Sequence, residues 1–89
     1  MAHVVFTPNL RRHVACPDAE APGETVRAVL DRVFADNQQL GAYVLDEQGA
    51  VRKHMGILVD GAPLRDRMRL SDPVRPDSRI HVLQALSGG

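Results

Sequence analysis

One segment of the chain has apolar residues at the spacing of an amphipathic helix. Five apolar side chains recur at intervals of three or four positions, namely Val26, Val29, Leu30, Val33 and Phe34. Thr25 stands before the first of them, where its hydroxyl can accept a hydrogen bond from a free backbone N–H. The pattern predicts a helix from about Thr25 to Asp36, with one apolar face that must be buried against another element.

Short runs rich in β-branched and aromatic residues predict strands before this helix. We expect a first strand at His3–Thr7, a turn at Pro8-Asn9 and a weaker return strand at Arg11–Cys16. Residues 17–23 contain two prolines and a glycine, so they are expected to form a loop.

The second half of the chain alternates between apolar anchors and turn residues. Residues 40–45 are compatible with a helical turn, and Asp46–Gly49 with an exposed turn. The strand at Gly56–Val59 should end at Asp60-Gly61, a common hairpin dipeptide. Beyond it we expect an irregular segment, a turn and a last strand, at Leu64–Val74 (anchored by Leu64, Leu70 and Val74), Pro76–Ser78 and Arg79–Leu86 respectively.

This order of elements predicts an α+β fold. A single helix with one apolar stripe has to pack across a sheet, and the order strand, strand, helix, strand, short elements, strand is compatible with a β-grasp. We therefore expect residues 1–86 to form a β-grasp domain, with a mixed sheet packed on one main helix, and residues 87–89 to form a flexible C-terminal tail.

The last strand has an alternating pattern that suggests a docking face. Ile80 and Val82 should point to one side of the sheet, and His81, Leu83 and Ala85 to the other. If the first pair faces the helix, Leu83 is an apolar residue on an open face, and such residues often mark docking sites. Single exposed apolar residues are also ordinary, but this strand runs directly into the tail. We expect docking there, with Leu58 taking part.

The tail ends in Ser87-Gly88-Gly89, after Leu86. Glycine has no Cβ, so two in a row can pass through a narrow channel of a partner. The terminal carboxylate could then attack the α-phosphate of ATP to give an acyl-adenylate. A sulfur nucleophile displacing AMP would leave a thiocarboxylate, whereas an amine would give an amide. Chain ends rich in Gly and Ser often have no function; the preceding strand is what favours a role here.

Composition excludes several other classes of protein. The chain has 89 residues, no net formal charge and three aromatic residues, so neither nucleic acid nor a membrane is an expected partner. A domain this small has little room for a deep active site, and we expect it not to be an enzyme. The N-terminus lacks a signal-peptide pattern, and the single cysteine, Cys16, excludes an internal disulfide. A cytoplasmic location is expected.

The remaining polar residues show no pattern typical of a catalytic or metal site. The four histidines have no metal-ligand spacing, and no histidine stands beside Cys16 in a recognisable motif, so no metal is expected. Of the histidines, only His81 falls on the predicted docking face. The arginines of the C-terminal third could meet an acidic partner or form a solvated face, and the interspersed aspartates favour the latter.

The chain resembles the MoaD/ThiS sulfur-carrier family, which is ubiquitin-like. The resemblance extends over most of the chain from Thr25 onward. It rests on the order and spacing of several segments: Thr25–Leu30, Leu45–Gly49, Val59–Gly61, Asp72–Val74, Pro76–Leu83 and Gly88-Gly89. The end of the chain also resembles ubiquitin, in Leu70–Asp72, Ser78, Ile80–Leu83, Leu86 and Gly88-Gly89.

The resemblance implies a β-grasp fold and a carrier function. A ubiquitin-activating-like enzyme would adenylate Gly89, using ATP and magnesium, and Gly89 would then carry the thiocarboxylate, with Gly88 giving access. The carrier would bind no cofactor itself. Its partners would be this adenylating enzyme and a sulfur-accepting biosynthetic enzyme. Contacts are expected at His81, Leu83, Ala85, Leu86, Ser87 and Leu58.

The sequence departs from the family pattern in two places. Many members have a Pro-Ala-type approach to the tail, whereas this chain has Gln84-Ala85-Leu86-Ser87. The segment 38–55 is longer than in the thiamine-type carriers and resembles carriers for cysteine synthesis or secondary metabolism. Molybdopterin, thiamine, cysteine and specialised metabolites all remain open as products. A ubiquitin-like modifier conjugated through Gly89, or a plain interaction domain, are the alternatives.

Overall fold

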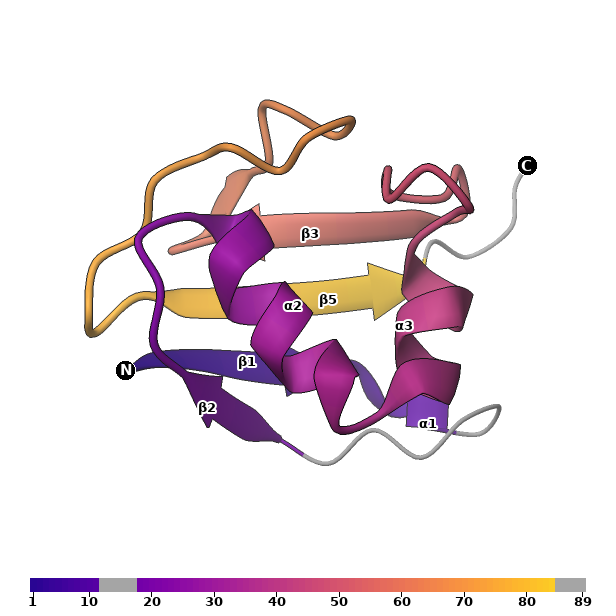
Figure 1. Ribbon diagram of the computed structural model, residues 1–89, viewed down its shortest axis with the longest axis horizontal. Coiled ribbons are helices and arrows are strands. Elements are labelled where there is room, and N and C mark those ends of the chain that lie inside the picture. The colour runs from indigo at the N-terminus through magenta and orange to yellow at the C-terminus, as the bar shows by residue number, and fades with distance from the viewer. Residues whose placement is uncertain (12–17, 85–89) are drawn as a thin grey trace.

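The fold is a mixed five-stranded sheet with its helices on one face (Figure 1). The computed structural model describes residues 1–11 and 18–84. The elements follow in the order β1 (Ala2–Phe6), α1 (Pro8–Arg11), β2 (Ala19–Ala21), α2 (Val26–Ala35), α3 (Gln38–Val44), β3 (Met55–Val59), β4 (Ala62–Pro63) and β5 (Arg79–Gln84).

The last strand lies in the middle of the sheet. The strand order is β2-β1-β5-β3-β4, so β5 is flanked by β1 and β3. β1 runs parallel to β5, while β3 is antiparallel to it, and the β1–β2 and β3–β4 pairs are antiparallel as well. Together with the helical layer, this arrangement confirms the predicted α+β fold with a mixed sheet.

α2 forms where the apolar spacing predicts a helix. Thr25 is its N-cap and accepts a hydrogen bond from the backbone N–H of Ala28 through Oγ1 at 3.2 Å. Asp36 is the C-cap, so the predicted bounds are confirmed. The apolar stripe of the helix is buried and packs in the same core as the inward residues of β1, β3 and β5.

A second helix, α3, follows after a short break. Asn37 caps it by accepting a hydrogen bond from the Leu40 N–H at 3.2 Å. Leu40, Gly41 and Val44 are buried, which extends the predicted helical turn to a full element. Gly41 lies against Phe34 of α2, so a Cβ at this position would be 2.9 Å from the Phe34 Cβ. The missing side chain therefore lets the two helices approach closely.

The hairpin between β3 and β4 has the predicted turn. Both central residues have positive φ, 51° at Asp60 and 86° at Gly61, as the primed hairpin turns require. The following irregular segment is held by Leu64 and Leu70, which are buried, and by the partly buried Val74. All three predicted anchors are confirmed.

The start of the chain differs from the predicted hairpin. Pro8 begins the short helix α1, because its fixed φ suits the first position of a helix. The antiparallel partner of β1 is β2, which lies within the predicted loop at residues 17–23, so the loop prediction is wrong at Ala19–Ala21. The predicted turn at Pro8-Asn9 is wrong, and Arg11 belongs to α1 instead of beginning a strand. The rest of the predicted return strand, residues 12–16, is not tested. Residues 12–17 lie outside the described part of the chain.

Candidate docking face and tail exit

The central position of β5 determines where the C-terminal residues begin. β5 ends at Gln84, opposite Met55, the first residue of β3. The described part of the chain therefore ends at the end of the sheet where β3 begins, and Figure 1 shows α1 and α3 near this end. The tail residues themselves lie outside the described part of the chain.

The side chains of β5 alternate between the two faces of the sheet. Ile80 and Val82 are completely buried on the helical side, while His81 and Leu83 are half-buried. This confirms the predicted alternation as far as Gln84. His81 and Leu83 therefore belong to the face that the helices leave uncovered.

His81 lies in a cross-strand row with two apolar neighbours. Its Cα is opposite Val5 of β1 on one side and Leu58 of β3 on the other. All three side chains are half-buried. Side chains directly opposite each other on one face are in contact range. The row therefore places an imidazole between two aliphatic groups at the centre of the open face.

Leu83 lies against the backbone of β3. Its partner in the register is Gly56, and a Cβ on Gly56 would be 3.2 Å from Leu83 Cδ1. Because Gly56 has no side chain, Leu83 can lie against β3 and remain partly accessible. We call Val5, Leu58, His81 and Leu83 the docking face.

A polar row borders the docking face toward the start of β5. His3 is opposite both Glu20 of β2 and Arg79 of β5. His3 Nδ1 lies 3.1 Å from Glu20 Oε1, and both side chains are about half exposed. The open face thus changes from charged to apolar along β5 in the direction of the tail.

The hairpin turn next to this row is held by the side chain of Asp60. Asp60 Oδ1 accepts a hydrogen bond from the Arg79 N–H at 2.9 Å, and Oδ2 accepts one from Ser78 Oγ at 2.8 Å. These two hydrogen bonds and the charge of Arg75 lower the pKa of Asp60. The start of β5 is therefore tied to β3 by both backbone and side-chain contacts.

The structure brings together three of the predicted site residues. Leu58, His81 and Leu83 share the docking face, as the alternation of the strands predicts. Ala85, Leu86, Ser87, Gly88 and Gly89 lie outside the described residues, so their roles stay predictions. Sequence reasoning missed Val5 and Gly56. The alternation of β1 and a glycine inside a strand were the signals for them.

Neither a metal cluster nor a membrane span is found in the described residues. Within 1–11 and 18–84, no group of three His, Cys, Asp or Glu side chains could hold a metal ion. No helix in these ranges is long and apolar enough to cross a membrane.

Comparison with known proteins identifies solved structures with the same fold. No family model and no curated protein sequence matches the chain. A chain of the Amycolatopsis orientalis BexX/CysO complex superposes with a TM-score of 0.81 at 23% identity, covering 100% of both chains. Small archaeal modifier protein 1 (SAMP1) from Methanosarcina acetivorans gives 0.79 at 22%, covering 99% of this chain and 95% of the other.

Mycobacterium tuberculosis CysO superposes equally well. Its TM-score is 0.79 at 20% identity, over 97% of this chain and 100% of the CysO chain. At these identities the similarity establishes the fold. The chain therefore has the β-grasp, ubiquitin-like fold that its resemblance to the MoaD/ThiS family implies.

Proposed function

We propose that this protein is a sulfur carrier of the MoaD/ThiS type, with Gly89 as the terminal residue that carries the sulfur. The observation that carries the proposal is the position of β5. This strand presents His81 and Leu83 on the open face and leads within a few residues to Gly88-Gly89. A partner on that face would have the tail within reach. The fold shared with the CysO proteins supports the same function.

The first partner in this proposal is an adenylating enzyme that recognises the docking face. Val5, Leu58 and Leu83 offer apolar contact area, and His81 offers a polar group at its centre. Apolar residues surrounded by polar ones are typical of interface centres. A protein chain with the same fold is also found in a complex, since the Amycolatopsis structure contains both BexX and CysO.

The chemistry starts at the carboxylate of Gly89. One carboxylate oxygen attacks the α-phosphate of ATP, and the bond to the β-phosphate breaks, releasing pyrophosphate and leaving an acyl-adenylate. Hydrosulfide, or a donor delivering sulfur at that oxidation level, then attacks the acyl carbon. AMP leaves with the electron pair of the broken C–O bond, and the product is a thiocarboxylate. The enzyme provides ATP and magnesium, and the carrier provides the acyl group.

The thiocarboxylate is then a sulfur donor for a biosynthetic enzyme, the second partner. Both partners would meet the carrier in the cytoplasm. In this proposal the carrier supplies only the reacting carboxylate of Gly89, and the enzymes supply the groups that catalyse each step. Its fold serves to present a recognisable face on the strand that leads to Gly89.

A ubiquitin-like modifier is the second candidate. SAMP1 is named as a modifier protein and shares the fold over 99% of this chain. The first step would be the same adenylation, followed by attack of a lysine amine in place of sulfur. The two candidates therefore diverge only after the acyl-adenylate, and the product at Gly89 distinguishes them.

The test is the mass of the intact protein purified from its own host under alkylating, non-reducing conditions. Exchange of a terminal oxygen for sulfur has the same nominal mass effect as one methionine oxidation. Fragmentation must therefore localise the change to Gly89, and an alkylating reagent must label it there. The carrier proposal predicts such a labelled Gly89. Isopeptide-linked Gly89 on lysines would instead support the modifier.

The control is a chain that ends at Ser87. It keeps all described residues but lacks Gly88-Gly89. It should show no label when the host's activating enzyme and ATP are supplied. If the full chain also stays unlabelled and unconjugated when its host's activating enzyme and ATP are supplied, both candidates are wrong. The interaction-domain alternative would then be preferred.

A further inference from the structure

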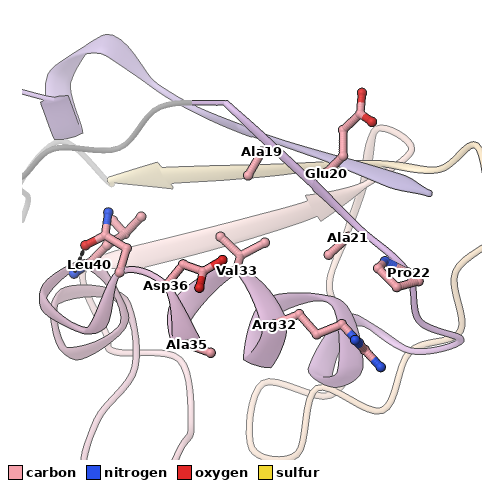
Figure 2. A pocket seen from close by; sticks show the side chains of 10 residues that line it. Ala19, Glu20, Ala21, Pro22, Arg32, Val33, Ala35, Asp36 and Leu40 are labelled. Atoms are coloured by element: carbon pink, nitrogen blue, oxygen red, sulfur yellow. Dashed lines mark hydrogen bonds between the residues drawn. The ribbon is translucent and has the colours of Figure 1, made fainter.

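A groove on the helical side of the molecule is separate from the docking face. It lies between the edge strand β2 and helix α2, has a volume of about 470 Å³, and is lined by residues 19–22, 32, 33, 35–37 and 40. Figure 2 shows Ala19 and Ala21 of β2 pointing toward α2, with Val33 facing them. The docking face is on the opposite side of the sheet.

Small side chains on β2 create this hollow. Ala19 and Ala21 stand where larger side chains of a strand would reach α2, and Val33 and Leu40 form a buried apolar floor. Three charged residues line the groove, namely Glu20, Arg32 and Asp36, and the side chain of Glu20 points away from α2 (Figure 2). Arg32 lies toward the Pro22 end and Asp36 toward the Leu40 end (Figure 2). The groove is thus apolar in the middle, with opposite charges at its ends.

The open edge of β2 has a backbone N–H and C=O directed outward at Glu20. The N–H of His3 donates to the Ser78 carbonyl, so odd residues of β1 face β5 and even residues face β2. Ala2 and Val4 are therefore the hydrogen-bonded partners of Ala21 and Ala19. Glu20, between them, has its backbone groups on the other side. β2 is the edge of the sheet, so these groups can pair with another strand.

We propose that the groove binds an extended peptide segment of a partner protein, as an added strand antiparallel to β2. A strand hydrogen-bonded to Glu20 would place its two neighbouring side chains on the helical side, opposite Ala21 and Ala19. Antiparallel pairing is the more stable and more common arrangement. Two apolar side chains at alternate positions would fill the space left by the alanines.

The charges at the two ends specify the rest of the segment. In the antiparallel direction the N-terminal end of the peptide lies near Arg32 and the C-terminal end near Asp36. An acidic residue therefore precedes the two apolar positions and a basic residue follows them, all at alternate positions. This pattern is acid-x-apolar-x-apolar-x-base, where x faces away from the groove. A partner bound in this way leaves the docking face and β5 accessible, so the inference does not depend on the sulfur-carrier proposal.

The test uses the peptide Glu-Thr-Val-Thr-Val-Thr-Lys, with blocked ends, titrated into the isotope-labelled protein. We expect saturable shifts of the Glu20 amide and of the α2 amides near Asp36 in nuclear magnetic resonance spectra. Amides of Leu58 and His81 should not move. The peptide with the order of its charges reversed, Lys-Thr-Val-Thr-Val-Thr-Glu, should bind about threefold to fivefold more weakly.

A charge exchange in the protein provides the decisive variant. Arg32 on α2 and Asp36, the C-cap of that helix, are both exposed, so the double variant R32E/D36K should keep the fold. It should prefer the reversed peptide by a similar factor. In a second pair, Ala19→Leu fills the groove and should abolish the shifts, whereas Ala42→Leu changes an exposed alanine of α3 outside the groove and should bind as the unmodified protein does.

Three results would overturn the proposal. One is the absence of a shift at Glu20 at millimolar peptide. Another is equal binding of both peptides to both charge arrangements. The third is broadening of the Glu20 amide with protein concentration and no peptide, because the groove would then take a second copy of this chain.

Discussion

Ser78 Oγ donates a hydrogen bond to Asp60 Oδ2 across 2.8 Å, and this contact ties the β3–β4 turn to the start of β5. Ser78 is buried, and its Oγ also accepts a hydrogen bond from the Arg75 N–H at 2.8 Å. The Arg79 N–H donates to the other oxygen of Asp60. The carboxylate of Asp60 thus connects the β3–β4 turn to Ser78 and Arg79, at the start of the strand that leads to the tail.

This arrangement makes part of the stability depend on pH. The hydrogen bonds from the Arg79 N–H and the Ser78 hydroxyl, with the charge of Arg75, lower the pKa of Asp60 below its ordinary value of 3.8. Because the pKa is lower in the folded state, the contribution is present above pH ~4 and is lost as the pH falls through the folded-state pKa. We expect Asp60→Asn to reduce the loss of stability in acid, measured by urea unfolding at neutral and acidic pH.

Asparagine is a suitable replacement because it tolerates the positive φ of residue 60. Glu47→Gln, at an exposed position far from this turn, is the matched control and should leave the acid dependence unchanged. Asp66 also has a lowered pKa, caused first by the hydroxyl of Ser71, so some acid dependence should remain in Asp60→Asn. An unchanged pH profile in Asp60→Asn would contradict the assignment.

Arg27 joins three segments that are far apart in the sequence. Its Nη2 donates to the Gly49 carbonyl at 2.5 Å and its Nε to the Arg69 carbonyl at 3.2 Å, while Nη1 lies 3.6 Å from Asp31. We expect Arg27→Met to lower the free energy of unfolding by about 1–3 kcal/mol, because two carbonyls lose a donor. Denaturant unfolding measures this change.

Arg32→Met is the control for Arg27, because Arg32 is an exposed residue of the same helix. Its effect should stay within about 0.5 kcal/mol. Arg27→Lys should recover only part of the loss, since an ammonium group cannot reproduce the planar fork that serves two carbonyls. Equal stabilities for the Met variants at both positions would contradict the bridging role.

Gly41 allows α3 to pack closely on α2. A Cβ at this position would be 2.9 Å from the Phe34 Cβ, which is too short for a real contact and cannot be relieved by a side-chain rotation. We expect Gly41→Ala to destabilise the protein by about 1–3 kcal/mol, despite the higher helix propensity of alanine. Gln39→Ala, at an exposed position of α3, should be neutral or slightly stabilising in the same urea unfolding experiment. A more stable Gly41→Ala would show that the helices can separate at little cost.

Leu83 provides the test of the docking face. We expect Leu83→Asp to lower kcat/KM of the proposed adenylation by about tenfold to thirtyfold, because a charge would replace an apolar contact at the interface centre. The rate of pyrophosphate release with the host's activating enzyme measures this. Met68→Asp is the matched control, since Met68 is 65% exposed and far from β5 in sequence.

Unfolding curves for both Asp variants separate binding from stability. Leu83 is half-buried, so a modest loss of stability is expected, but the protein should remain folded at the assay temperature. If Leu83→Asp and Met68→Asp are activated at the same rate, the partner does not bind the docking face.

The elements that sequence analysis predicted well are stabilised by contacts within a few residues. The start of α2 follows from Thr25 and the Ala28 N–H three positions later, and its burial follows from the apolar spacing. The turn at Asp60-Gly61 needs two adjacent residues with positive φ. The alternation of His81 and Leu83 is a property of any strand. Each of these interactions is specified by neighbouring residues, so the order of amino acids is sufficient to reveal it.

Other features depend on residues that are distant in the sequence. β2 has three residues and is a strand because Ala19 and Ala21 pair with Val4 and Ala2 of β1, which sequence spacing alone does not indicate. The space that Gly56 leaves for Leu83, and the groove between β2 and α2, exist only once the sheet and helices are assembled.

The sequence by itself therefore determined the main helix, the hairpin turn and the alternation of the last strand, while the role of Gly89 stays a proposal. The tertiary structure decided which strands are neighbours and which side chains share a face. The physical reason is that strand pairing and helix packing bring together residues separated by tens of positions, and their free energy depends on the shape of both partners.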